Sequence, residues 1–416
     1  MFAPGRLKTR RVTDRRPAFR CETIYGSMIL GAGCAGLSLA WNLVERGVKH
    51  PILLVDRRER FENDRTWCFW DVEPTPFSNL ATHAWTRWMV HDGRREKVVD
   101  CPEYPYLRIR SADVYRRVLD RLAGVPGVDL ALGRSILGVD ESREGVKVAT
   151  TIGDFSGLRA FDSSGRPPGS VVRGLRPELL QHFFGRTIRV SRPVFDPSCP
   201  TLMDFRTSQK DGPHFVYLLP LSETEALVEN TYLFPFAISV ARHRAEIADY
   251  LAKRYGVAPK DCTLIEEESG AIPMTMALPT ASGGGSRIIP IGLAGGAARP
   301  SSGYAFLRIQ RQTAALAAQV ASGSRFEPGQ ALRPLGSPKY RFFDAIFLRT
   351  LADRPDLAPS IFSRMFERAA PASVVRFLGE RSTALDDLKI VAALPKLPFV
   401  ASAIRSATSR PPRPLG

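Results

Sequence analysis

A glycine-rich segment near the N-terminus has the residue types and spacing that bind a dinucleotide. Residues 31–36 read GAGCAG, a GxGxxG pattern that follows the apolar run Met28–Leu30. Glycines here permit a tight turn and let a pyrophosphate approach the amides at a helix N-terminus. Asp56 ends the next apolar run, twenty residues after the last of these glycines, where a carboxylate can bind ribose hydroxyls. The pattern predicts cofactor binding by Gly31, Gly33, Gly36 and Asp56.

A second glycine-rich segment, residues 292–306, lies far downstream. It follows the apolar run Ile288–Ile291 and leads into a helical pattern over 304–320. Many small residues let backbone amides approach a planar ring, which favours a flavin over a nicotinamide cofactor. The alternative is a loop between core elements. The glycines concerned are Gly292, Gly295, Gly296 and Gly303.

Glu229 places a carboxyl group on a strand face that is otherwise largely apolar. Leu227, Glu229, Thr231 and Leu233 share this face, because successive side chains of a strand point to opposite sides. A carboxyl group in a dry, apolar pocket has a raised pKa and suits acid catalysis near neutral pH. On the pattern alone, Glu229 could instead be an edge-strand residue that points to solvent.

Arg65, Trp67 and Trp70 follow the strand that ends at Asp56, where a chain can cross the cofactor or roof a substrate tunnel. Arg65 could contact pyrophosphate and the aromatic rings could contact an apolar substrate. Packing of the rings at a domain interface is equally compatible with the pattern. Asp162 lies where the chain of flavoproteins with a comparable arrangement of strands returns to the cofactor, although Asp162 could simply cap a turn.

The elements that must position these residues alternate between strands and helices. Strands are expected near 28–30, 51–56, 128–139 and 144–152, with helices from 37 to 43 and from an N-cap at Ser111 to Leu122. A hairpin is expected over Phe215–Phe234, with its turn at Ser222–Glu225. The fold class is therefore α/β, with a Rossmann-type cofactor domain, an inserted mixed β-sheet substrate domain and a helical C-terminal region.

The 416 residues are enough for two domains around one cofactor. We expect a disordered basic extension over 1–23 and the first part of the cofactor domain over 24–175. A β-rich substrate domain should follow over 176–276. Residues 277–325 should return to the cofactor domain, and residues 326–416 should be helical with a basic tail.

Composition narrows the class of protein. The hydrophobic content of 44% and charged content of 24% are those of a soluble globular protein. The longest uncharged apolar run is too short to span a bilayer. Six cysteines without a CxxC pair indicate free thiols in a reducing cytoplasm and make a metal site improbable.

The net charge of +16 is concentrated at the two ends of the chain. No aromatic-basic motif for nucleic-acid binding accompanies it. The charge therefore reflects either solvated tails or attraction to an anionic membrane surface. The amphipathic stretch Ile361–Leu378 could lie in the head-group layer or could pack on the protein's own core.

The sequence resembles the bacterial lycopene cyclase family of flavoproteins. The resemblance covers about residues 28–400, and its most specific motifs are Asn63–Trp70 and Gly292–Phe306. Other matching segments are the GxGxxG loop, Met203–Arg206, the Phe215–Phe234 hairpin and Phe343–Arg349. Asn230 is a departure, because several relatives have another acid or an aromatic residue after the glutamate.

Family membership implies FAD that is active in its reduced form, with NAD(P)H as the reductant. It also implies acid-catalysed closure of β-rings on lycopene, or a related linear carotene, without net redox change. Glu229 matches the family's catalytic glutamate. The implied substrate pocket includes Trp67, Trp70, Tyr217 and Tyr304. The expected location is the cytoplasm, with peripheral attachment to the inner face of the membrane.

Two other functions fit the same pattern. One is a redox flavoenzyme, such as a monooxygenase or hydroxylase that acts on an apolar isoprenoid. A halogenase should carry a WxWxIP-like signature, and the sequence has none. The other is a non-catalytic flavoprotein at a membrane, which would leave Glu229 unexplained.

Overall fold

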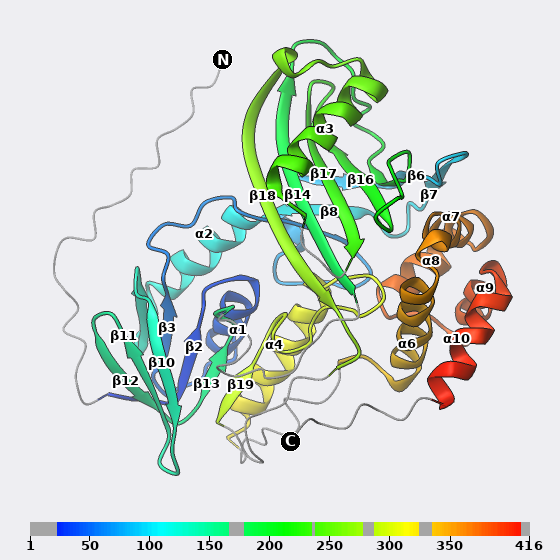
Figure 1. Ribbon diagram of the computed structural model, residues 1–416. Helices are drawn as coiled ribbons and strands as arrows, with labels where there is room; N and C mark the ends of the chain where they lie inside the picture. The colour runs from blue at the N-terminus through cyan, green and yellow to red at the C-terminus, as the bar shows by residue number, and fades with distance from the viewer. Residues whose placement is uncertain (1–22, 166–178, 235–237, 278–286, 324–334, 409–416) are drawn as a thin grey trace.

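The computed structural model describes residues 23–165, 179–234, 238–277, 287–323 and 335–408. Figure 1 shows a parallel-sheet region at one end, a large, mostly antiparallel mixed sheet above it and a group of C-terminal helices beside that sheet. The expectations for residues 1–22 and for the basic tail after residue 408 lie outside the described residues.

The first region is built on a parallel sheet of five strands in the order β19-β13-β2-β3-β9. Its strands are almost continuously apolar because both of their faces are buried. On one face, α1 and α4 pack together, with α2 beside α1. On the other face lies a smaller sheet, β1-β12-β11-β10. The bounds are β1 Ile24–Tyr25, β2 Ser27–Leu30, β3 Ile52–Asp56, β9 Val128–Leu132, β10 Ile136–Glu141, β11 Val146–Thr150, β12 Gly153–Gly157, β13 Ala160–Asp162, β19 Ile288–Pro290, α1 Cys34–Glu45, α2 Ser111–Leu122 and α4 Phe306–Ala321.

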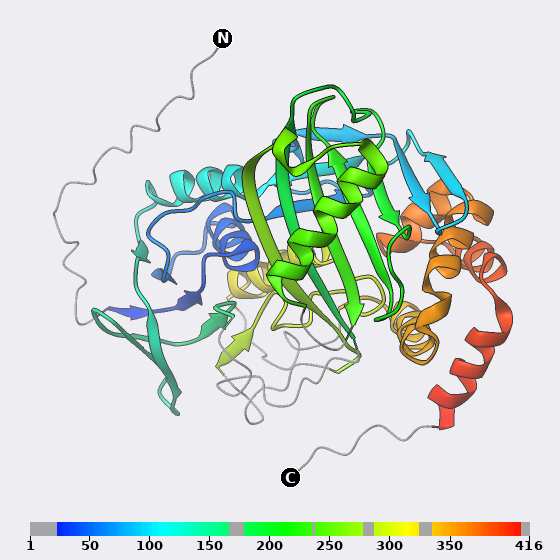
Figure 2. The ribbon, with the colours of Figure 1, turned by 45° about the horizontal axis from the view of Figure 1, so that its top comes forward.

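The second region is a seven-stranded sheet in the order β18-β14-β17-β16-β15-β6-β7. Helix α3 (Val240–Tyr255) covers its outer face, as Figure 2 shows, and buries Ile247 and Leu251 against the sheet. Residues 87–100 supply two strands of this sheet and not of the cofactor domain in which they are expected, because Trp88 and Val90 pack into the core of this sheet. The bounds are β6 Arg87–His91, β7 Glu96–Asp100, β14 Leu179–Val190, β15 Thr201–Asp204, β16 His214–Pro220, β17 Glu225–Phe234 and β18 Cys262–Met274.

A small sheet and the C-terminal helices complete the structure. The small sheet has the order β4-β8-β5, from β4 Thr66–Trp70, β8 Tyr106–Arg110 and β5 His83–Trp85. Short 3-10 helices span Ser78–Leu80, Pro259–Asp261 and Pro355–Leu357. The C-terminal helices are α6 Pro338–Asp353, α7 Ala358–Arg368, α8 Pro371–Leu378, α9 Ala384–Ala393 and α10 Lys396–Thr408.

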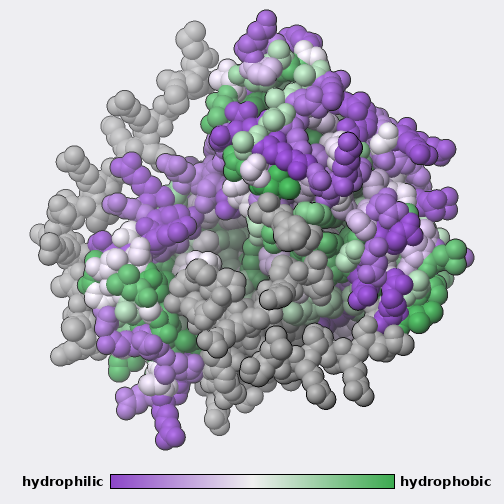
Figure 3. Space-filling view, in the orientation of Figure 1, coloured by the Kyte–Doolittle hydropathy of each residue, from purple (hydrophilic) through white to green (hydrophobic). Residues whose placement is uncertain are grey.

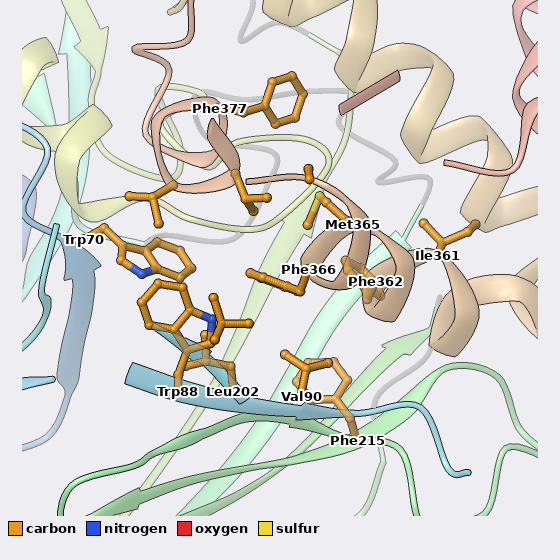
Figure 4. Packing of buried hydrophobic residues seen from close by; sticks show 14 of the residues in the cluster. Trp70, Trp88, Val90, Leu202, Phe215, Ile361, Phe362, Met365, Phe366 and Phe377 are labelled. Carbon is orange, nitrogen blue, oxygen red and sulfur yellow. The ribbon is translucent and has the colours of Figure 1, made fainter. Parts of the chain in front are cut away.

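The amphipathic stretch Ile361–Leu378 is packed on the protein's own core and is not a free surface. Ile361 and Val374 are fully buried, and Phe366 is 3% exposed. Figure 4 shows the α7 side chains directed at Trp88 and Phe215 of the large sheet. The apolar face of this stretch is therefore used for folding.

Two local expectations differ from the structure. Ser111 is the first residue of α2 and not its N-cap, because its hydroxyl instead accepts a hydrogen bond from the Arg65 amide at 3.0 Å. Glu225 begins β17 and pairs with Arg189 across the sheet, so the hairpin turn ends one residue earlier.

Candidate active site

The GxGxxG loop leaves an open helix N-terminus. Gly31 has a φ of +95°, and a side chain there would meet the backbone of Ser163 and Ser164. A Cβ atom at Gly36 would collide with the carbonyl oxygen of Gly31, whereas nothing lies within 4 Å of one at Gly33. Helix α1 has no side-chain cap and no acid in its first turn. The open space at Gly33, the free amide groups of the first turn and the helix dipole of α1 thus fit a bound pyrophosphate.

Asp56 fixes the shape of this loop. Its Oδ2 accepts a hydrogen bond from the Ala32 amide at 2.6 Å, and its Oδ1 accepts one from the Arg58 amide at 2.7 Å. Burial favours the neutral acid, but the hydrogen bonds from Arg58 and Ala32 outweigh it and hold the pKa of Asp56 below its usual value. Asp56 is therefore an ionised group at the end of β3, beside the loop.

Asp162 ends the neighbouring strand β13, next to β2. Its Oδ1 accepts hydrogen bonds from the Ser164 amide at 3.0 Å and from the Ser164 hydroxyl at 2.7 Å. The carboxylate thus caps the turn that passes behind Gly31.

The second glycine-rich segment connects β19 to α4. The Gly292 amide donates to Gln312 Oε1 at 2.8 Å, and the Gly295 carbonyl accepts from Gln312 Nε2 at 3.1 Å, so helix α4 holds the loop. Gly296 lies in the same turn. Gly303, with a φ of +71°, reaches the wall of a cavity.

This cavity has a volume of about 210 Å³ and lies where the large sheet, the small sheet, the second glycine-rich segment and α7 meet. Its walls are mainly apolar, and they include Leu227, Phe215, Ile272, Met274, Phe362 and Phe366. Of the side chains that we expected in a substrate pocket, Trp67, Tyr217 and Tyr304 line the cavity, as does the exposed Arg65. The structure places Trp70 in the core, where its ring contacts Trp88, Tyr106 and Tyr304.

Glu229 lies on the cavity wall in the middle of the large sheet. Strand β17 runs between β14 and β16, so Glu229 is not on an edge strand. Its Oε1 accepts a hydrogen bond from the Thr231 hydroxyl at 3.0 Å. Burial, reinforced by the nearby charge of Glu268, raises the pKa of Glu229 far above the usual carboxyl value. The site therefore holds a carboxyl group that can remain protonated near neutral pH.

Sequence reasoning missed Glu268 and Tyr106, which also line the cavity. The Tyr106 and Tyr217 hydroxyls lie 3.0 Å apart, and burial raises the pKa of both well above the usual value. Glu268 belongs to the run Glu266–Glu268, which reads as a solvated surface. The available signal was alternation, since Glu268 shares a strand face with Gly270, Ile272 and Met274.

A family model described as lycopene cyclase protein matches residues 27–404. A lycopene beta-cyclase of Paracoccus sp. (strain N81106 / MBIC 01143) is 27% identical over 92% of this chain and 97% of its own. The lycopene beta-cyclase of Pseudescherichia vulneris is 26% identical over 89% of this chain and 94% of its own. With the Pantoea ananas lycopene beta-cyclase the match is 27% identical over 61% of this chain and 63% of the relative.

Solved structures share the fold at low identity. A flavin-dependent brominase superposes with a TM-score of 0.58 at 14% identity, covering 93% of this chain and all of the other. A geranylgeranyl bacteriochlorophyll reductase-like protein from Thermoplasma acidophilum superposes with a TM-score of 0.57 at 13% identity, covering 92% of this chain and 99% of the other. The predicted fold class, a Rossmann-type domain of the kind found in flavin-dependent enzymes joined to a mixed sheet, is confirmed.

Proposed function

The chain belongs to the lycopene cyclase family, and from that membership we propose that it is a lycopene β-cyclase of carotenoid biosynthesis. It converts the linear ends of lycopene to β-rings, by way of γ-carotene to β-carotene, without net redox change. The observation that carries the proposal is the position of the Glu229 carboxyl group on the wall of a mainly apolar cavity, an environment that raises its pKa. Ring closure of an alkene requires a proton donor where water is scarce.

Glu229 donates a proton to the terminal double bond of the substrate and leaves a tertiary carbocation. The neighbouring alkene attacks this cation and closes a six-membered ring. The aromatic side chains of Phe215, Tyr217, Trp67 and Tyr304 line the cavity in which this cation would form. Aromatic faces stabilise positive charge without trapping it as a covalent adduct. Loss of a ring proton then gives the β-end group.

The cofactor we propose is FAD, which the residues of the first region fit. The open N-terminus of α1 at Gly33 would hold the pyrophosphate, and Asp56, at the end of β3 beside this loop, would bind ribose hydroxyls. Arg65, on the cavity wall, is a second candidate for the pyrophosphate or the ring system. Reduced FAD, with NAD(P)H as the reductant, would supply negative charge near the carbocation.

The other partner we propose is an anionic membrane surface, where the water-insoluble substrate resides. Exposed apolar side chains gather on α9 and α10, and Figure 3 shows hydrophobic surface at that edge of the molecule. Exposed Lys389 and Lys396 accompany them. Within the described ranges, every helix is too short or too polar to cross a bilayer. The apolar residues are Leu385, Leu388, Val391, Leu397, Val400 and Ile404.

Expression in cells that accumulate lycopene tests the proposal. We expect red lycopene to be replaced by cyclised carotenes of the same mass, and purified protein with reduced FAD should give the same products. A product that contains oxygen would instead support a monooxygenase, and one solved structure of similar fold is a p-nitrophenol 4-monooxygenase. Unchanged lycopene in the presence of flavin-loaded protein would contradict both activities.

A further inference from the structure

A second carboxyl group faces Glu229 across one strand of the large sheet. Strand β14 lies between β17 and β18, and Gly185 of β14 pairs with Glu229 on one side and with Glu268 on the other. Side chains of directly paired residues project from the same face of a sheet. Glu229 and Glu268 therefore both project from the face that forms the cavity wall, and both line the cavity.

Because residue 185 is a glycine, side chains from both neighbouring strands can close in over β14. A Cβ atom at Gly185 would lie 3.1 Å from Leu227 Cδ1, 3.2 Å from Glu268 Cγ and 3.6 Å from Glu229 Cβ. Any larger side chain at this place would stand between the two carboxyl groups. The absence of a side chain at residue 185 thus lets Glu229 and Glu268 lie over the same strand.

The surroundings of the two acids are unequal. The Thr231 hydroxyl donates to Glu229, whose neighbours on the same strand face include Leu227 and Leu233. The amide and hydroxyl of Thr66 hydrogen-bond to Glu268, and the positive charges of Arg65 and Arg108 lie nearby. Negative charge is therefore better stabilised on Glu268 than on Glu229.

The thiol and phenol groups at this wall stay neutral near neutral pH. Burial raises the pKa of Cys68 to about 12, and burial also raises those of Tyr106, Tyr217 and Tyr304. Burial raises the pKa of Glu268 as well, more than its hydrogen bonds lower it. Two carboxyl groups that line one apolar cavity, a single strand apart, do not both ionise readily, so the pair keeps one proton.

We propose that Glu268 is the base that completes the cyclisation, an inference that rests on the proposed function. The Glu229 O–H bond breaks as a C–H bond forms at the terminal alkene carbon, and the neighbouring alkene supplies the electron pair of the new C–C bond. A ring C–H bond then breaks. Its electron pair forms the ring double bond and its proton goes to the Glu268 carboxylate. Transfer of that proton past Gly185 to Glu229 restores the pair without any oxidant or reductant.

Glu268→Gln keeps the size of the side chain and removes the base. We expect cyclisation with reduced FAD to fall by roughly 10²-fold or more, since one acid or base contributes about 10²–10⁴-fold. We expect residual product to shift toward other positions of the ring double bond, because a different proton leaves. Glu268→Asp should recover part of the rate. Flavin content should remain that of the unaltered protein, which shows that the variants fold.

The pH profile separates a base from a merely structural residue. The Glu268 charge helps to raise the pKa of Glu229, so Glu268→Gln should shift the alkaline limb of kcat/KM to lower pH. Glu267→Gln is the matched control, because Glu267 is the next residue of β18 and pairs with Arg186 and Arg244 instead. Glu267→Gln should leave the rate of cyclisation, the position of the ring double bond and the alkaline limb of the pH profile unchanged.

The outcomes distinguish this inference from the function on which it rests. Normal rate, unchanged β-product and an unmoved alkaline limb in flavin-loaded Glu268→Gln would overturn the role of Glu268 while leaving the cyclase function intact. Failure of the unaltered protein to cyclise lycopene would overturn both. A lower rate with unchanged product distribution and an unmoved limb would assign Glu268 to structure and also overturn the proposal.

Discussion

Arg299 and Asp344 form a buried ion pair that joins the second glycine-rich segment to helix α6. Arg299 Nε donates to Asp344 Oδ1 at 2.9 Å, and the two side chains are 1% and 2% exposed. The Ser301 hydroxyl donates to the same oxygen at 2.6 Å, and Arg299 Nη1 donates to the Phe377 carbonyl at 2.6 Å. The loop that reaches the cavity is thus fixed to two C-terminal helices.

Asp344→Asn should destabilise the protein strongly. The substitution keeps the size of the side chain but leaves the Arg299 guanidinium buried without a counter-charge, which costs about 3–5 kcal/mol in comparable cases. Denaturant unfolding of the purified protein measures this loss. Asp356→Asn is the control, because Asp356 pairs with Arg354 on the surface, and its unfolding midpoint should not move. Equal midpoints for the two variants would contradict a structural role for the Arg299–Asp344 pair.

The ion pair also shows what the sequence could and could not predict. Segments 292–306 and 343–349 were recognised separately as motifs, but nothing in either motif indicates that Arg299 meets Asp344. Local patterns predicted the helix at 111–122, the strand that ends at Asp56 and the shared strand face of Glu229, because each depends on neighbouring residues. The pairing of β14 with both β17 and β18 is long-range.

Because strand pairing is long-range, the sequence indicates Glu229 as a site residue but does not indicate Glu268. Glu268 becomes a site residue only because β18 lies two strands from β17, in a register in which Gly185 of β14 pairs with both Glu229 and Glu268. The location of Ile361–Leu378 was ambiguous in a similar way, since an amphipathic helix has the same pattern whether it faces lipid or a protein core. In this protein the stretch faces the core, because its apolar side chains pack in the same cluster as Trp88.

Gly33→Ala should weaken FAD binding without loss of stability. Nothing lies within 4 Å of the added Cβ atom, and the backbone at Gly33 is extended, so the apoprotein tolerates the methyl group. That methyl group would occupy the space above the α1 N-terminus that we assign to pyrophosphate. We expect the Kd for FAD, measured by flavin fluorescence, to rise about tenfold or more. Gly124→Ala, which is equally unobstructed but remote from the loop, should bind FAD normally.

Membrane attachment should depend on the exposed apolar face of α9 and α10. The double substitution Leu388→Asp with Leu397→Asp places charge on side chains that are 64% and 84% exposed. We expect it to reduce flotation with anionic liposomes several-fold, because charged groups oppose insertion into the head-group layer. Leu264→Asp, on β18, serves as the control and should float like the unaltered protein. Equal flotation of all three proteins would locate the contact elsewhere.

Cyclisation should persist through neutral pH and fall as the medium becomes alkaline. Burial raises the pKa of Glu229, so the carboxyl group keeps its proton well above the ordinary glutamate pKa of about 4.3. The active form is the protonated one, and rate is therefore lost as pH rises through the raised value. A pH–rate profile with reduced FAD and saturating substrate measures this limb. Loss of rate between pH 4 and 6 would mean that Glu229 has an ordinary pKa or does not donate the proton.

Glu229→Gln is the most direct test of the acid. The amide keeps the size of the side chain and can still accept the hydrogen bond from Thr231, but it has no transferable proton. Cyclisation should fall by roughly 10²–10⁴-fold, the usual contribution of one general acid. FAD binding should be unchanged, because Glu229 lies on β17 and not on the GxGxxG loop. Glu229→Asp should retain some activity if the shorter acid still reaches the alkene.

Glu225→Gln is the matched control for that substitution. Glu225 lies on the same strand, four residues away, and its partner is Arg189, whose side chain is 61% exposed. Loss of this surface pair should leave the rate of cyclisation nearly unchanged. Carotene products from both variants can be quantified by chromatography against flavin content. Full activity of folded, flavin-loaded Glu229→Gln would require another proton source, and Glu268, the other acid on the same wall, would be the first residue to test.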